Sequence, residues 1–447
     1  MIARRPIPEV APGGRLTLPE YGQETLPTGL RLIAAERRTT LFEVRLRVPF
    51  IGAPGAQAVI LAETVLAGTT SRGQGDPHRD LHEIGGHLQA SVDADNLIVR
   101  GSALAEHAER LLEILADALA CPAFPAGPVD VARGRIARAM RVSSNQPGLI
   151  VHDELNRRLY PGHPYGAAMP KAAQVLAVDR ADLVHLHRQL VCPSGATLVM
   201  IGGVPPDTAL RSARGIMARW DRKSAGLAVP PTPSFVAGAL GLVHRPGAVQ
   251  SSVRLAMAGV GLLDPRFAAL QLANLVLGGY FSARLVDNLR ERNGFSYTPG
   301  STLVHRRLVT TVVVSFDVST AVTAAALEET YRELETLATK RIDGWELERA
   351  RRYVLGRQRL AMTSTTATAD LLAELAGHGA DLDWFAEHGD QLNDAGPAEV
   401  HQVAEYFLAP SRTAGVVLGD AEKVHNGRIA LATSGDERMR RVLKSVD

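Results

Sequence analysis

The sequence predicts an α+β protein made of two homologous halves, each an antiparallel sheet backed by helices. Residues 45–120 and 254–338 show the same order of elements at an offset of about 210 residues, a repeat too long for a solenoid and typical of a duplicated domain. Each half mixes alternating strands with long amphipathic helices, such as residues 323–338 and 343–363. That mixture favours sheets covered by helices.

In order along the first half, the pattern predicts strand, helix, loop, helix, strand and helix. The segments are RLRVPFIGAPG, QAVILAETVLAGT, DLHEIGGHLQ, ASVDADNLIVRG and HAERLLEILADAL. The second half repeats this order with RLAMAGVG, RFAALQLANLVLGG, SARLVDNLRERNG, FSYTPGSTLV, TTVVVSFDV and ALEETYRELETL. VLAG at residues 65–68 and VLGG at residues 276–279 mark matching helix ends. The order of elements therefore indicates duplication.

A linker separates the two halves. Residues 222–235, RKSAGLAVPPTPSF, combine Gly, Ser and three prolines, so they cannot continue a helix or a central strand. We therefore expect a first domain at residues 25–221 and a second domain at residues 236–435, with the linker acting as a hinge.

Composition excludes several function classes. Of the 447 residues, 49 are basic and 47 acidic, so no broad field attracts nucleic acid or an anionic membrane. Two cysteines argue against a disulfide framework. The N-terminal segment has no apolar h-region and no stretch reaches the length of a membrane span, so we expect a cytoplasmic protein.

The segment LGGYFSARLVDNLRERNGFSYTPGS, residues 277–301, carries the candidate catalytic pair Arg290 and Tyr297. A helix is expected over residues 283–292, ended by Asn293-Gly294, with a strand starting at Phe295. A guanidinium in the last helical turn and a phenol just beyond it can converge on one carbonyl oxygen and stabilise an oxyanion. The structural alternative is a surface arginine and a core tyrosine.

This segment resembles a signature of the pitrilysin/insulinase family of zinc peptidases, which includes the mitochondrial processing peptidases. The resemblance rests on the Gly-rich LGGYFSARL, then Leu289-Arg290-Glu291, Gly294 and Tyr297. It extends over roughly residues 25–420, through TLPTGLRLIAAERRTTLFEVRLRV, VLAGTTSR and RADLVHLHRQLVCPSGATLVMIGGV. It implies that Arg290 and Tyr297 contact substrate near the scissile bond, and that Gly278, Gly279 and Tyr280 bind substrate.

The zinc motif is where this sequence departs from the family. Hydrolytic members carry His-x-x-Glu-His on the first helix, and here the corresponding positions are Val59, Ala62 and Glu63. The third ligand position falls at Arg138 or Ala139. Because a catalytic zinc needs three protein ligands, we expect no metal and no other cofactor in this chain.

Two further histidine motifs have the wrong geometry for zinc. HEIGGH places His82 and His87 five residues apart, which on a helix puts them about 140° apart, and its Gly pair favours a helix end before the strand LQASVDADNLIVRG. His185 and His187 have no third ligand in view.

The resemblance implies a division of labour between two chains. This chain is expected to be the non-zinc subunit of a heterodimeric metallopeptidase, inactive alone, which binds an extended peptide and supplies Arg290 and Tyr297 to a zinc-bearing homologous partner. The alternative is an inert scaffold or peptide-binding module of a larger assembly. A third hypothesis is an independent hydrolase that uses His82, Glu83 and His87.

Overall fold

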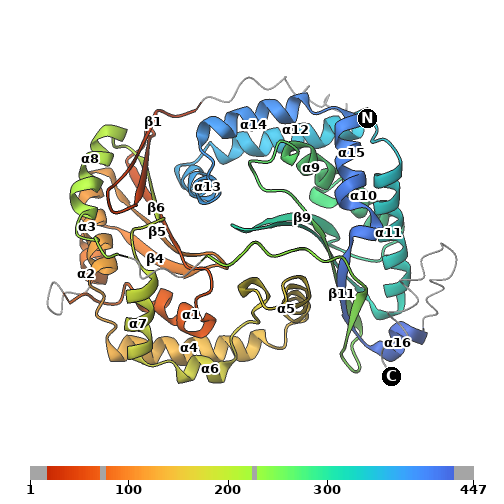
Figure 1. Cartoon of the computed structure of the whole chain (residues 1–447), viewed down its shortest axis with the longest axis horizontal. Helices are drawn as coiled ribbons and strands as arrows, with labels where there is room; N and C mark the ends of the chain where they lie inside the picture. Colours follow the sequence, from red (N-terminus) through yellow and green to blue (C-terminus); the bar gives the residue numbers. More distant parts are fainter. Residues whose placement is uncertain (1–17, 71–76, 224–228, 427–447) are drawn as a thin grey trace, which may run out of the picture.

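The computed structural model of the chain describes residues 18–70, 77–223 and 229–426, and contains two sheets with helices on both faces (Figure 1). The first sheet has the strand order β1-β2-β6-β3-β5-β4, and the second has the order β7-β11-β8-β10-β9. The strands of the first sheet are β1 Tyr21–Thr25, β2 Arg31–Glu36, β3 Leu41–Pro49, β4 His87–Val92, β5 Asn96–Leu104 and β6 Thr197–Gly202. Those of the second are β7 Leu240–His244, β8 Gln250–Ala258, β9 Gly300–His305, β10 Thr310–Ser319 and β11 Ala414–Gly419.

The helices of the two halves also follow each other in matching order. The first half has α1 Gly55–Thr64, α2 Pro77–Glu83, α3 Ala108–Ala120, α4 Ala126–Ser143, α5 Pro147–Leu159, α6 Ala172–Ala177, α7 Arg180–Leu190 and α8 Pro206–Met217. The second has α9 Phe267–Asn274, α10 Arg284–Val286, α11 Thr323–Thr339, α12 Gly344–Ala361, α13 Thr365–Gly377, α14 Leu382–Asp394, α15 Pro397–Leu408 and α16 Ala421–Asn426. No helix in the described part of the chain is both long and apolar enough to cross a membrane.

The α+β class and the duplication are confirmed, with one difference in the sheets. Removing β1 leaves two five-stranded sheets of the same connectivity, but each contains a parallel pair, β2 with β6 and β7 with β11. The sheets are therefore mixed. Strand β6 arrives after a long helical excursion and inserts between β2 and β3, and only such a long connection permits a parallel neighbour.

The predicted strand ASVDADNLIVRG is instead part of a hairpin formed by β4 and β5. The Asp93 carboxylate accepts hydrogen bonds from the backbone N–H groups of Asp95 and Asn96, at 2.8 and 2.7 Å. An aspartate that bonds the backbone two residues on makes a turn, and this turn interrupts the apparent strand.

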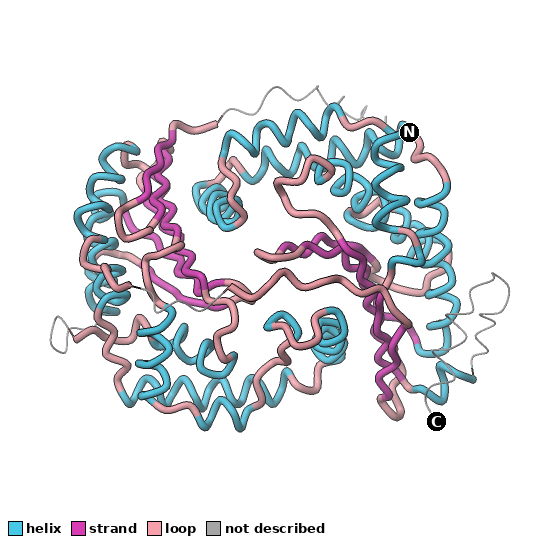
Figure 2. Tube along the Cα trace, viewed as in Figure 1, coloured by secondary structure: helices cyan, strands magenta, loops and turns pink. Residues whose placement is uncertain are grey.

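The two halves interlock through one exchanged helix each. Helix α13 of the second half covers β3 and β6 of the first sheet, and α5 of the first half covers β8 and β11 of the second, as Figure 2 shows. Buried side chains of α13 and the first sheet belong to a single apolar cluster with the second half, which includes Ile33, Val199, Leu372 and Ala376. Because each sheet needs a helix from the other half to bury one face, the halves form one interlocked unit.

The connection between the halves contains no regular structure where it is described. Residues 222–223 and 229–235 form neither helix nor strand, and the connection runs through the middle of the molecule to β7 (Figure 1). Residues 224–228, and residues 427–435 at the end of the expected second domain, lie outside the described residues.

Candidate functional site

The segment with Arg290 and Tyr297 ends a helix of unusual geometry. Helix α10 continues as a π-helical turn over Asp287–Arg292, and its apolar side chains, among them Leu285 and Leu289, are buried. Gly294 has φ +62°, and its N–H donates to the Arg290 carbonyl at 3.2 Å. The predicted stop at Gly294 is thus present, because a left-handed residue satisfies the last helical carbonyls.

The predicted strand at Phe295 is wrong, since β9 begins at Gly300. The Phe295 N–H caps the helix by donating to the Leu289 carbonyl at 2.7 Å. The Ser296 hydroxyl donates to the carbonyl of Asp317, at 2.9 Å. Because of these bonds, the backbone after Gly294 caps the helix and does not pair in a sheet. Tyr297 therefore projects from a turn.

Arg290 and Tyr297 lie together on the surface. The Arg290 guanidinium carbon is 5.0 Å from the ring centroid of Tyr297 and equally 5.0 Å from that of Phe281. Tyr297 is 79% exposed, so it is not a core residue, and its hydroxyl has no hydrogen bond to another described residue. Arg290 Nε also lies 3.3 Å from the Glu291 carboxylate, while stacking on the rings leaves the edge of the guanidinium with its terminal N–H groups accessible. The pair therefore presents N–H and O–H donors from one exposed surface.

Gly278, Gly279 and Tyr280 lie directly before this segment and support it. A Cβ at Gly278 would approach the Ser301 backbone nitrogen to 2.6 Å, so only glycine lets the π-helical turn Leu275–Gly279 pack this closely on β9. A Cβ at Gly279 would meet Leu275 Cδ2 at 2.9 Å. The Tyr280 ring packs on Tyr353 with centroids 5.3 Å apart, and burial raises the pKa of its hydroxyl.

The positions expected for zinc ligands hold no metal-binding set. Val59, Ala62 and Glu63 lie on α1, and the Glu63 carboxylate pairs with Arg135 of α4 at 2.5 Å. Arg138 and Ala139 are exposed on the same helix. Within residues 18–70, 77–223 and 229–426, no group of three His, Cys, Asp or Glu side chains could hold a metal ion. Glu63 is the only carboxylate at these expected ligand positions, and it is paired with the Arg135 guanidinium and not with a metal-binding set.

The structure separates the members of the other two histidine motifs. His82 is on α2 and His87 opens β4, and Gly85 with φ +60° ends the helix between them, as predicted. His187 is buried, with Nε2 3.0 Å from the Leu119 carbonyl oxygen, and burial lowers its pKa to about 4. His185 is exposed, so the two do not form a pair.

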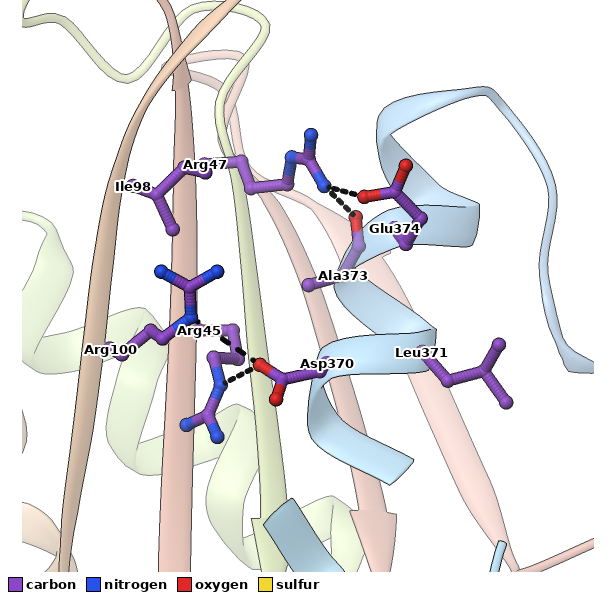
Figure 3. A pocket seen from close by; sticks show the side chains of 8 residues that line it. All are labelled: Arg45, Arg47, Ile98, Arg100, Asp370, Leu371, Ala373 and Glu374. Atoms are coloured by element: carbon purple, nitrogen blue, oxygen red, sulfur yellow. Dashed lines mark hydrogen bonds and ion pairs between the residues drawn. The ribbon is translucent and has the colours of Figure 1, made fainter. Parts of the chain in front are cut away.

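A cavity of about 320 Å³ lies elsewhere, between the first sheet and α13 (Figure 3). Three arginines line it, and its two carboxylates are bound to them: Asp370 to Arg45 at 2.6 Å, and Glu374 to Arg47 at 2.5 Å. Arg100 also lies 3.5 Å from Asp370, so each of the three arginines is paired with a carboxylate, and we interpret the cavity as the polar contact between the two halves.

Sequence reasoning missed the aromatic residues that lie on and near the Gly-rich segment. Phe281 contacts its guanidinium, and Trp345 and Tyr353 are exposed on α12. The spacing of Trp345, Arg349 and Tyr353 at every fourth position in a predicted helix was the available signal. The sequence did not show that these residues lie close to the Gly-rich segment, because that segment is more than sixty residues away along the chain.

Two family models match the chain. Residues 57–172 match the model described as insulinase (peptidase family M16), and residues 177–354 match the model described as peptidase M16 inactive domain. The structure of a peptidase M16 inactive domain from Pseudomonas fluorescens superposes with a TM-score of 0.82 at 20% identity, covering 89% of this chain and 98% of that one. At this identity the superposition shows the fold.

Several curated proteins are similar over part of their length. An uncharacterized zinc protease of Bacillus subtilis, YmxG, is 23% identical over 67% of this chain and 73% of its own length. Cytochrome b-c1 complex subunit 1 of Mus musculus is 26% identical over 49% of this chain and 46% of its own. The mitochondrial-processing peptidase subunit beta of Neurospora crassa is 22% identical over 51% of this chain and 48% of its own length. The match therefore spans less than half of these two mitochondrial proteins.

Proposed function

The chain belongs to the insulinase (M16) family of peptidases, and we propose that it is the non-zinc subunit of a heterodimeric metallopeptidase. In this proposal it binds an extended peptide and supplies Arg290 and Tyr297 to the site of a zinc-bearing homologous subunit. The observation that carries the proposal is the exposed pair itself, with a 79% exposed phenol stacked on a guanidinium.

The chemistry of hydrolysis explains why two chains are needed. Peptide hydrolysis requires an activated water and stabilisation of the oxyanion that forms when water attacks the carbonyl. Zinc in the partner would supply the activated water. We assign this chain the second requirement, because at the expected zinc positions Val59 and Ala62 cannot bind a metal and Glu63 is paired with Arg135. Alone, the chain is therefore expected to be inactive.

Arg290 and Tyr297 suit the oxyanion role by their placement. Arg290 carries a permanent charge, and its contacts with two rings hold the guanidinium in one orientation. The Tyr297 hydroxyl has no described partner to release before it donates to a substrate oxygen. Preorganised donors of this kind contribute most when water is excluded, and a second subunit placed over this surface would exclude it.

Gly278, Gly279 and Tyr280 are assigned an indirect part in substrate binding. The two glycines allow close packing of the turn against β9, and Tyr280 joins that turn to α12 through Tyr353. We expect their loss to displace Phe281 and Arg290, and thereby to weaken peptide binding.

The test is reconstitution with a homologous subunit that carries His-x-x-Glu-His. Each subunit alone and the mixture are assayed on an unstructured peptide, with a chelator control, and association is measured by sedimentation velocity. We expect the mixture to cleave, the separate chains to be inactive, and the chelator to abolish cleavage. A partner that cleaves equally fast alone would refute the proposal.

An inert scaffold is the second candidate. It is favoured by the similarity to cytochrome b-c1 complex subunit 1, a named component of a complex, and by the match of residues 177–354 to an inactive-domain model. The two candidates differ in whether the Tyr297 hydroxyl affects turnover. A reconstituted pair whose rate is indifferent to Tyr297 and Arg290 would favour the scaffold.

A further inference from the structure

We propose that the surface beside Arg290 selects peptides with acidic side chains, an inference that rests on the proposed function and names its substrate class. The surface consists of Tyr280, Phe281, Trp345, Arg349 and Tyr353, which we call the aromatic-arginine face. Aromatic residues make up only 5% of the chain, so three exposed ones beside the half-buried Tyr280 need an explanation.

The face is built on one side of α12. Trp345, Arg349 and Tyr353 are spaced by four residues and therefore lie along one side of the helix. Trp345 is 57% exposed and Tyr353 36%, whereas the opposite side, with Leu347 and Val354, is buried in the core. The helix thus exposes large aromatic side chains to solvent, where they contribute little to the stability of the fold.

Contacts between elements join this stripe to the candidate catalytic pair. Tyr280 packs on Tyr353, and Phe281 contacts the Arg290 guanidinium. Arg284 of α10 makes two hydrogen bonds to the Glu346 carboxylate, both 2.7 Å long, and each partner is largely shielded from water. This bidentate pair holds α10 and α12 together, and the consecutive residues Tyr280 and Phe281 connect the face to Arg290.

The face carries a positive charge that is not paired within the described structure. Helix α12 contains five arginines and two glutamates, a formal charge of +3. Both glutamates are committed, Glu346 to Arg284 and Glu348 to Arg351 and Arg352. The Arg349 guanidinium carbon lies 5.0 Å from the Trp345 ring centroid, and no described carboxylate pairs with it. Its N–H edge is free to bind.

A carboxylate is the group that this arrangement fits. A guanidinium stacked on an indole presents a planar fork of donors that matches the two oxygens of Asp or Glu. A Lys or Arg side chain in the same place would meet like charge. With the scissile carbonyl at Arg290 and Tyr297, an acidic side chain a few residues along an extended peptide would contact Arg349, and the rings would cover its neighbours.

The test compares substrates that differ at one residue. The reconstituted pair cleaves an unstructured peptide rich in glycine and serine, in which one position at a time is Asp or Lys. We expect kcat/KM to favour Asp over Lys by roughly fivefold at one position near the scissile bond, the size expected for exposed ion pairs. Arg349→Glu should reverse this preference. No preference at any position, or a preference that survives Arg349→Glu, refutes the inference.

Two controls separate a local subsite from general attraction. Arg211→Glu makes the same change of charge at an exposed position of α8 in the other half and should leave the Asp-over-Lys ratio unchanged. Arg357→Glu makes it on α12, two turns beyond Arg349, and should shift the ratio much less. An equal shift in Arg357→Glu would indicate attraction by the whole helix and overturn the subsite.

Direct binding separates this inference from the proposed function. Fluorescence anisotropy of labelled Asp and Lys peptides with the isolated chain needs neither zinc nor a partner. Binding of Asp peptides that Arg349→Glu abolishes, in a chain that never reconstitutes activity, would support the acidic site and refute the subunit role. Reconstituted activity without any charge preference would do the reverse.

Discussion

The Arg290 guanidinium lies against the ring of Tyr297, 5.0 Å from carbon to centroid, while the tyrosine is 79% exposed. The stack fixes the orientation of the phenol through its ring and not through its hydroxyl. Loss of the hydroxyl and loss of the stack are consequently separable by mutation.

Tyr297→Phe keeps the stack and removes only the O–H donor. We expect it to lower turnover of the reconstituted pair by about 10²–10³, the usual cost of one preorganised donor, without changing assembly. Arg290→Ala should cost at least as much, because it removes a charged donor and the stack. Tyr406→Phe is the matched control, since Tyr406 is also exposed and stacked on an arginine, Arg412, at 5.1 Å. Wild-type rates in both site variants would remove the pair from the mechanism.

Purified chain is expected to contain no stoichiometric zinc. Val59 and Ala62 offer no ligand atoms and Glu63 is paired with Arg135, whereas a catalytic zinc needs three protein ligands. Elemental analysis of the isolated chain measures this. Close to one zinc per chain, lost on joint substitution of His82 and His87, would reinstate an independent hydrolase.

Arg45→Ala should destabilise the fold far more than Asp370→Asn. The Arg45 side chain is 4% exposed and binds both Glu43, 8% exposed, and Asp370, 48% exposed. Removing Arg45 leaves the buried Glu43 carboxylate with only the Thr366 hydroxyl, a loss of about 3–5 kcal/mol. Removing the Asp370 charge breaks a partly exposed pair, a loss of about 1 kcal/mol.

Urea unfolding with matched m-values measures the difference. Glu43→Gln added to Arg45→Ala should restore part of the loss, because it removes the uncompensated buried charge. Equal effects of the two single substitutions would contradict this account of the contact between the halves.

Stability should fall as pH drops from about 6.5 to 4. Burial lowers the pKa of His187, His305 and His388 to about 4, so the unfolded chain binds their protons first. Each histidine's contribution to the free energy of unfolding is complete above its unfolded-state pKa near 6.5. About 3 kcal/mol for each group is lost as the pH falls toward its folded-state pKa of about 4.

Thermal unfolding across this pH range tests the point. His388→Gln should flatten the profile, because glutamine cannot take up a proton, and the exposed His185→Gln serves as the control. An acid profile unchanged by His388→Gln would assign the loss to other groups.

Gly294→Ala should destabilise the turn before Tyr297 by about 1 kcal/mol. Its Cβ would meet nothing within 4 Å, so the cost comes from φ +62° alone. Gly215→Ala in α8 also meets nothing within 4 Å but is helical, and should stabilise by about 0.5–1 kcal/mol. Chemical denaturation should show changes in the free energy of unfolding of opposite sign for the two substitutions. No change in Gly294→Ala would contradict this prediction.

Local patterns were sufficient wherever a feature depends on neighbours in sequence. The repeated order of elements, the helix ending at Gly294 and the helix end within HEIGGH were all readable in this way. Periodicity reports which side of an element is apolar, and glycine reports where the backbone must turn.

Only the tertiary structure decided which distant faces meet. The exchange of α5 and α13 and the stacking of Tyr280 on Tyr353 join segments whose local patterns do not indicate a partner. An amphipathic helix such as α13 needs an apolar surface, but either sheet would satisfy its periodicity. The choice depends on the summed burial and charge pairing of the whole assembly, such as Arg45 with Asp370, which no single segment contains.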